Sequence, residues 1–304
     1  MIPEFSINGF PVSVLLNGNL PAAFPAPPLP SSASLQFYTS VEGATANFSY
    51  TGQNCPKAPA AAPTITSGGV VPIYSVTPVV QPGEWVSICG SNLASSAVTW
   101  SGDFPISLGG TSVSIDGKSA YLWYVSPTQI NLQAPADSAT GSVPVIVTTS
   151  AGSSPTATVT LAQFAPSFSL LDSKHVTGIL LRTNGQGAYG GGSYDIIGPT
   201  GSSLGYATVA AKSGDTIVLF GVGFGPTNPA VPPGQSFSGA APTTSSVIVD
   251  INGMPVNATF AGLSGAGLYQ INLTLPANLG VGDVSLQASV GGVKTQAGVV
   301  ISLQ

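Results

Sequence analysis

Charged residues are scarce in this sequence. Six Lys and Arg and eleven Asp and Glu make up 6% of its 304 residues, whereas a typical soluble domain has about 25%. Amphipathic helices need charged side chains on the face that meets water, so this composition argues against a helical fold. A protein that binds nucleic acid needs a basic stripe to neutralise phosphates. With six basic residues and a net charge of −5, the chain is predicted to have no nucleic-acid partner.

Long apolar runs are also missing, although the mean hydropathy is +0.38. The longest candidate, residues 217–224, is interrupted by Gly221 and Gly223, and a membrane helix needs about 18 apolar residues. We therefore expect no membrane span. Residues 1–4 show neither the basic nor the apolar region of a secretory leader, so we expect a processed chain or another export route.

Residue types suited to catalysis are few and scattered. His175 is the only histidine, and although Asp172 precedes it by three residues, no Gly-x-Ser-x-Gly motif supplies a nucleophile. No spacing of His, Cys or carboxylates matches a zinc site or a calcium loop; a calcium ion held by loop carbonyls stays open. The glycine-rich stretch 185–192 has no lysine after it that could hold a phosphate. We expect no enzyme activity, no catalytic residue and no cofactor.

Glycine and proline, by contrast, are abundant, with 38 and 27 residues. This composition is typical of short strands joined by tight turns. The chain also contains an internal repeat, which indicates two copies of one structural unit. Three pairs of stretches match in order: 81–90 with 212–221, 113–117 with 249–253, and 129–135 with 270–276. The spacing between the copies grows along the chain, so the second copy carries insertions, most clearly at 225–246.

Each copy contains a strong hairpin signal. Asp116-Gly117 and Asn252-Gly253 lie between alternating apolar residues, and such dipeptides favour two-residue turns between antiparallel strands. We predict an all-β fold of two tandem immunoglobulin-like β-sandwiches with an N-terminal β-strand arm. The predicted boundaries are 1–62 for the arm, 63–163 for the first sandwich and 164–304 for the second.

Several stretches of the two copies resemble known families. Residues 82–93 read Pro-Gly-Glu-Trp-Val-Ser-Ile-Cys-Gly-Ser-Asn-Leu and residues 124–131 read Tyr-Val-Ser-Pro-Thr-Gln-Ile-Asn, and 223–229 and 267–272 add to them. Together they resemble the conserved C-terminal domain family of unknown function found in secreted proteins of Solibacter and other Acidobacteria. Each copy also resembles an IPT/TIG-type immunoglobulin-like domain. The resemblance covers 63–304, departs at Cys89, where an aromatic is usual, and implies fold and export but no established activity.

Aromatic residues gather in the first copy, at Trp85, Trp100, Tyr121, Trp123 and Tyr124. Exposed coplanar rings would form a stacking platform for sugars, which makes Trp100, Tyr121 and Trp123 candidate ligand-facing residues. Strand alternation predicts that Tyr124 shares one face with Leu122, while Tyr121 and Trp123 share the other. Because both faces are then apolar, core packing plus an interdomain or intersubunit contact is favoured over a sugar site.

The two cysteines suggest a disulfide. Cys89 occupies the strand position that Phe220 fills in the second copy, so its side chain is predicted to face into packing. Cys55 precedes the Pro- and Ala-rich stretch 56–63. In an oxidising compartment an even pair favours a Cys55–Cys89 bridge. The alternative, a buried thiol at 89 and an exposed one at 55, stays open.

The N-terminal arm differs from the rest of the chain. Its first apolar residues alternate with small or polar ones and predict a strand with one apolar face: Phe10, Val12, Val14 and Leu16. A proline-rich extended spacer follows at 21–30, and 35–38 with 46–50 predicts a further hairpin. An apolar strand on a stiff spacer fits addition to the open sheet edge of a neighbouring copy. The alternative is that the arm packs on its own first domain.

These features favour an extracellular or cell-surface structural protein. The leading hypothesis is a subunit of a bacterial surface filament or layer, which binds copies of itself head-to-tail by strand addition. The alternative is a monomeric adhesive or carbohydrate-binding module on the cell surface, with a surface polysaccharide as its partner.

Overall fold

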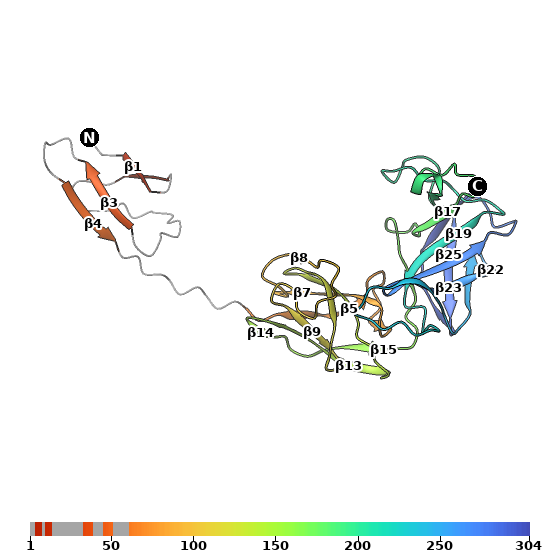
Figure 1. Cartoon of the computed structure of the whole chain (residues 1–304), viewed down its shortest axis with the longest axis horizontal. Helices are drawn as coiled ribbons and strands as arrows, with labels where there is room; N and C mark the ends of the chain where they lie inside the picture. Colours follow the sequence, from red (N-terminus) through yellow and green to blue (C-terminus); the bar gives the residue numbers. More distant parts are fainter. Residues whose placement is uncertain (1–3, 8–9, 14–32, 39–44, 51–60) are drawn as a thin grey trace. The chain divides into compact units, whose positions relative to one another are not determined.

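The computed structural model describes residues 4–7, 10–13, 33–38, 45–50 and 61–304, and it confirms the all-β prediction (Figure 1). The one helical segment in these ranges is the short 3-10 turn η1 (Gly190–Gly192). No helix of this described part is long and apolar enough to cross a membrane. The chain divides into two compact units, Met1–Pro59 and Ala60–Gln304.

The described residues of the first unit form two antiparallel hairpins. β1 (Glu4–Ile7) pairs with β2 (Phe10–Ser13), and β3 (Ala33–Tyr38) pairs with β4 (Thr45–Tyr50), which confirms the predicted second hairpin. The proposed donor strand therefore has one edge paired with its own chain. Val14, Leu16 and the proline-rich spacer lie outside the described residues, so strand addition to another copy stays a prediction.

Two facing sheets make up the first sandwich. Its strands are β5 (Thr64–Pro72), β6 (Val79–Val80), β7 (Trp85–Ser91), β8 (Val98–Thr99), β9 (Ser112–Ile115), β10 (Lys118–Ser119), β11 (Tyr121–Val125), β12 (Gln129–Gln133), β13 (Gly141–Thr149), β14 (Gly152–Ser153) and β15 (Ala157–Leu161). One sheet has the order β10-β9-β13-β15-β6, with β14 beside β13, and the other has the order β5-β7-β12-β11-β8. Alternate side chains, such as Ile88, Leu132 and Val145, are fully buried between them.

The second sandwich repeats this plan. Its strands are β16 (Ser167–Phe168), β17 (Gly178–Leu181), β18 (Tyr194–Ile196), β19 (Thr216–Val222), β20 (Ser238–Pro242), β21 (Val247–Ile251), β22 (Met254–Asn257), β23 (Phe260–Gly265), β24 (Leu268–Thr274), β25 (Gly282–Val290), β26 (Val293–Lys294) and β27 (Val300–Leu303). The sheets have the orders β18-β17-β19-β24-β23-β20 and β22-β21-β25-β26, with β16 beside β19 and β27 beside β25. Phe168 and Phe224 are fully buried in the core.

The strand registers confirm the internal repeat. In the first sandwich Val86 of β7 lies opposite Leu132 of β12. The matching residues of the second copy, Ile217 of β19 and Leu273 of β24, lie opposite each other in the same way. Since a slip of one residue would turn every core side chain outward, equal registers mean that the two copies use the same alternation to build their cores.

The two predicted hairpin turns are also confirmed. Asp116 and Gly117 have φ angles of 50° and 71°, and Asn252 and Gly253 have φ angles of 53° and 80°. They join β9 to β10 and β21 to β22. Positive φ at both central residues defines a type I′ turn, whose twist matches that of the flanking strands.

The prediction that Cys89 faces into packing is wrong. In β7 the side chains of Val86 and Ile88 point into the core, so Cys89 points outward and is exposed. The equivalent Phe220 also lies on the outer side of its sheet and is half-buried. Cys89 has no disulfide partner among the residues that the structure describes. Cys55 lies outside them, so the Cys55–Cys89 bridge stays a prediction.

Candidate functional site

A β-bulge in β11 directs the aromatic side chains of the first sandwich. Leu122 lies opposite Leu132 and Tyr124 opposite Asn131, so Trp123 is an extra residue in the ladder. Leu122 and Val125 are both fully buried, which places Trp123 and Tyr124 together on the outer side of the sheet. The predicted alternation, with Tyr124 on the face of Leu122, is wrong because the bulge shifts the strand by one residue.

Trp85 is the centre of an aromatic cluster on this outer side. Its ring centroid lies 5.8 Å from that of Trp100 and 5.7 Å from that of Trp123, with interplanar angles of 81° and 69°. Phe104 packs edge-on against Trp100, with centroids 4.5 Å apart. The rings therefore interlock edge-to-face and do not form the coplanar platform that a simple stacking site would have. Trp100 and Trp123 remain half-buried rather than fully covered.

The second sandwich covers part of this cluster. Trp85 Nε1 donates a hydrogen bond to the carbonyl oxygen of Ala266 at 2.7 Å, and the Gly234 amide donates to Oε1 of Gln133 at 2.9 Å. A Cβ on Gly234 would lie 2.2 Å from the ring of Tyr121, so only glycine permits this approach. Trp85 and Tyr121 thus serve the interdomain contact that the sequence favoured. We call this contact the joint.

A pair of amide side chains on β12 lies on the same outer side of the sheet as the aromatic cluster. Gln129 Nε2 donates to Asn131 Oδ1 at 2.8 Å, and Ser87 Oγ donates to the same oxygen at 2.9 Å. Tyr124 lies opposite Asn131 across the strand pair. Within the described part of the chain, no hydrogen bond uses Nδ2 of Asn131 or Oε1 of Gln129. One amide donor and one carbonyl acceptor therefore stay available beside aromatic rings.

We call five of these residues the first outer face, since they lie on one side of the same sheet and are not all needed by the joint: Trp100, Trp123, Tyr124, Gln129 and Asn131. The structure thus keeps two of the predicted ligand-facing aromatics, Trp100 and Trp123, on this face, and it places Tyr121 against the joint. Sequence reasoning missed the amides. Their signal was the Gln-Ile-Asn stretch shared by both copies, which indicated only the repeat.

The joint also contains a buried carboxyl group. Glu84 is fully buried, and its Oε1 accepts a hydrogen bond from the Gln81 amide at 2.7 Å. Its other oxygen, Oε2, has no hydrogen-bond partner in the described part of the chain. Burial raises the pKa of Glu84 well above its usual value, although the Gln81 amide acts in the opposite direction. The sequence indicated only a turn residue here.

Hydrogen bonds next to Glu84 cross the joint. Gln81 Nε2 donates to the hydroxyl oxygen of Tyr269 at 2.9 Å, and the Gly225 amide donates to Gln81 Oε1 at 2.5 Å. The Tyr269 hydroxyl donates in turn to the carbonyl oxygen of Gly225. Burial also raises the pKa of Tyr269. Burial therefore favours the protonated form of both Glu84 and Tyr269.

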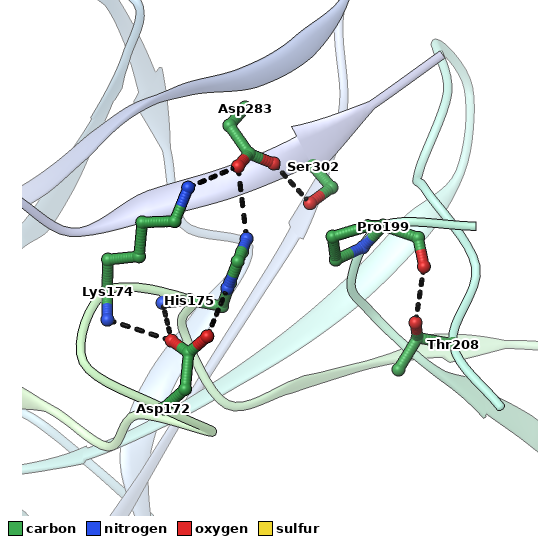
Figure 2. A network of polar contacts seen from close by, with 7 residues as sticks. All are labelled: Asp172, Lys174, His175, Pro199, Thr208, Asp283 and Ser302. Atoms are coloured by element: carbon green, nitrogen blue, oxygen red, sulfur yellow. Dashed lines mark hydrogen bonds and ion pairs between the residues drawn. The ribbon is translucent and has the colours of Figure 1, made fainter. Parts of the chain in front are cut away.

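His175 lies between two carboxylates and not beside a nucleophile (Figure 2). Its Nδ1 is 2.7 Å from Asp172 Oδ2 and its Nε2 is 3.1 Å from Asp283 Oδ2. Ser302 Oγ donates to Asp283 at 2.7 Å, as does Lys174 Nζ. A Ser-His-Asp triad needs the serine on the histidine, whereas here the serine contacts only the carboxylate. The network clamps the loop before β17 onto β25 and β27.

Both carboxylates of this clamp favour the ionised form. Burial opposes ionisation of Asp172, but hydrogen bonds from the amides of His175 and Lys174 outweigh it and lower its pKa to about 2. Hydrogen bonds from Lys174 and Ser302 lower the pKa of Asp283 to about 2. Both carboxylates of the clamp are therefore ionised near neutral pH, where Asp283 forms an ion pair with Lys174.

Neither a metal centre nor a cavity identifies a second candidate site in the described part of the chain. No group of three or more His, Cys, Asp or Glu among the described residues could hold a metal ion. One cavity of about 310 Å³ is lined by 64–70 and 155–158. Another, of about 290 Å³, is lined by residues around Leu275 and Leu303. Neither includes a residue of the first outer face.

Comparison with known families identifies the class of the first sandwich. Residues 70–162 match the IPT/TIG domain family, which confirms the predicted resemblance for this part of the chain. The resemblance to the acidobacterial secreted family stays a prediction. No curated protein matches the chain.

Several solved structures are similar to this chain at a low level. SGBP-B of the Bacteroides ovatus mixed-linkage glucan utilization locus, in complex with a mixed-linkage heptasaccharide, is 11% identical with a TM-score of 0.32, over 90% of this chain and 53% of that one. The Escherichia coli adhesin FdeC is 14% identical with a TM-score of 0.23, and the match covers 86% of this chain and 68% of that one. The plexin A4 extracellular region is 13% identical with a TM-score of 0.28, and the match covers 82% of this chain and 19% of that one. The chain thus spans about half of SGBP-B and a fifth of plexin A4, and likenesses this loose carry no functional argument.

Proposed function

We propose that this protein is an extracellular, non-catalytic binding module that holds a neutral polysaccharide on the first outer face. The observation that carries the proposal is the unused donor on Asn131 and the unused acceptor on Gln129, on the side of the sheet where Tyr124 lies opposite Asn131 and where Trp123 also lies. Each sugar hydroxyl both donates and accepts hydrogen bonds, and the apolar C–H face of a sugar ring packs on aromatic side chains. The face offers both kinds of contact.

The charge of the chain supports a neutral ligand. The five residues of the face include no Asp, Glu, Lys, Arg or His. The whole chain has six basic residues and a net charge of −5, which disfavours anionic polymers. The cell-surface or extracellular location is part of the proposal and is supported by the uncharged, Gly-rich composition and by the predicted family resemblance.

The contacts of His175, the only histidine of the sequence, support a non-catalytic role. Both ring nitrogens of His175 contact carboxylates of the clamp, so neither is available to activate a serine or a water. The surface filament stays a separate prediction. Strand addition would have to use the other edge of β2, because one edge already pairs with β1 of the same chain.

Binding to purified polysaccharides tests the proposal. The whole chain is run by affinity electrophoresis in gels that contain a β-glucan, a xylan, a mannan or, as an anionic control, polygalacturonate. We expect retardation by at least one neutral polymer, with no release of reducing sugar from it. Trp123→Ala and Asn131→Ala should each weaken binding about tenfold or more, the effect of losing about 1.4 kcal/mol of contact.

The matched control is Tyr189→Ala, which truncates a half-buried aromatic of the second sandwich that stacks on Tyr194 at 6.0 Å. It should bind like the unmodified chain. Near-UV circular dichroism of each variant reports whether the sandwiches remain packed. Retardation by none of the neutral polymers, or equal binding by folded Trp123→Ala and Asn131→Ala, would overturn the proposal.

A further inference from the structure

The amide pair of the first outer face recurs in the second sandwich with the same geometry. Gln270 Nε2 donates to Asn272 Oδ1 at 2.9 Å on β24, as Gln129 donates to Asn131 on β12. Both residues of the second pair are half-buried and lie on the outer side of their sheet, since Tyr269, Ile271 and Leu273 point into the core. Within the described residues, Nδ2 of Asn272 and Oε1 of Gln270 form no hydrogen bond.

The aromatic neighbour of the asparagine recurs as well. Phe260 of β23 lies opposite Asn272, in the register position that Tyr124 occupies opposite Asn131. On the other side, Phe220 of β19 lies opposite Gln270. Phe220 and Phe260 are both half-buried. The second amide pair is therefore flanked by a ring on each neighbouring strand.

The fold alone does not require these side chains. The cores are built from the intervening residues, Ile130 and Leu132 in one copy and Ile271 and Leu273 in the other. The outer neighbours have changed between the copies, since Phe220 stands where the first copy has Cys89. Asparagine is unfavourable in strand interiors, yet it is present at this outward position in both copies. Packing of the two cores does not require the repeated pair.

We propose that Phe220, Phe260, Gln270 and Asn272 form a second outer face that binds the same neutral polysaccharide, so that each chain has two sites. This inference rests on the proposed function of the first outer face. The second face is also uncharged, and it offers the same donor and acceptor between two apolar rings. Two sites on one chain increase the apparent affinity for a polymer through avidity, without any new contact.

Calorimetry with a short oligosaccharide counts the sites. The probe is a hexasaccharide of whichever neutral polysaccharide retards the whole chain. We expect two hexasaccharides per unmodified chain, one per chain for Asn272→Ala and for Phe260→Ala, and one for Asn131→Ala. Tyr189→Ala, the matched control, should bind two. With the intact polymer, loss of the second face should lower the apparent affinity on the order of 100-fold.

The outcomes separate the two proposals. A stoichiometry of one that Asn131→Ala abolishes and Asn272→Ala leaves unchanged overturns the second site and leaves the first intact. An unmodified chain that binds neither hexasaccharide nor polymer overturns both. If Asn272→Ala fails to fold, Gln270→Ala gives the same count, because it removes the acceptor and leaves the asparagine of the strand in place.

Discussion

Replacement of Glu84 by glutamine should change how stability depends on pH. Gln keeps the shape of the side chain and the oxygen that accepts the Gln81 amide, but it cannot ionise. Glu84 is fully buried, and its Oε2 has no hydrogen-bond partner among the described residues. Gly223 packs closely against this oxygen, since a Cβ added to Gly223 would lie 2.6 Å from it. An ionised carboxylate is strongly disfavoured in such a place.

The direction and size of the effect follow from proton linkage. The pKa of Glu84 in the folded chain is raised above its ordinary value of 4.5. Below pH 4.5 both folded and unfolded chains hold the proton, and the group contributes its full stability. Between 4.5 and the folded pKa the folded chain holds one proton more, so the free energy of unfolding falls by about 1.4 kcal/mol per pH unit. Above the folded pKa the loss is complete and constant.

Urea unfolding measured by tryptophan fluorescence between pH 4.5 and 8 tests this reasoning, because Trp85 lies in the same joint. Glu84→Gln should match the unmodified chain at the acid end and become increasingly more stable as the pH rises. The matched control is Asp137→Asn, since the side chain of Asp137 is also only 3% exposed, but a hydrogen bond from Lys118 lowers its pKa. The free energy of unfolding of this variant should change with pH in parallel with that of the unmodified chain between pH 4.5 and 8. Parallel curves for Glu84→Gln would refute the linkage argument.

Three further predictions concern the clamp, the cysteines and the arm. The pKa values of Asp172 and Asp283, lowered from 3.8 to about 2, contribute stability above pH 3.8 that is lost as the pH falls toward 2. Asp283→Asn should therefore lower the free energy of unfolding at neutral pH and flatten its acid dependence, and an unchanged urea midpoint at pH 7 would argue against the clamp. Thiol labelling of the denatured, unreduced chain should find no reactive thiol if Cys55 and Cys89 are bridged, whereas two labels per chain would exclude the bridge. Deletion of residues 1–20 should leave both sandwiches folded and abolish any head-to-tail assembly seen by light scattering; assembly by the truncated chain would exclude strand addition.

The sequence by itself determined the class of fold and its duplication. Alternation of apolar residues and the Asp-Gly and Asn-Gly turns are local signals, since a two-residue turn depends only on φ angles that its own residues can adopt. The positive φ angles at Asp116 and Asn252 confirm that these dipeptides act as expected. The equal registers of the two copies likewise follow from core residues that the repeat displays in order.

Only the tertiary structure decided where the outward side chains lie and what they contact. The bulge at Trp123 reverses the face of Tyr124, because an extra residue in one strand shifts all the following side chains. Beside Glu84, Gln81 bonds to Tyr269, 188 residues further along the chain. No local pattern encodes such a contact. The Gln-Asn pairs are visible in the sequence, but strand pairing placed Tyr124 and Phe260 beside them, since register across strands is set by the packing of the whole sandwich.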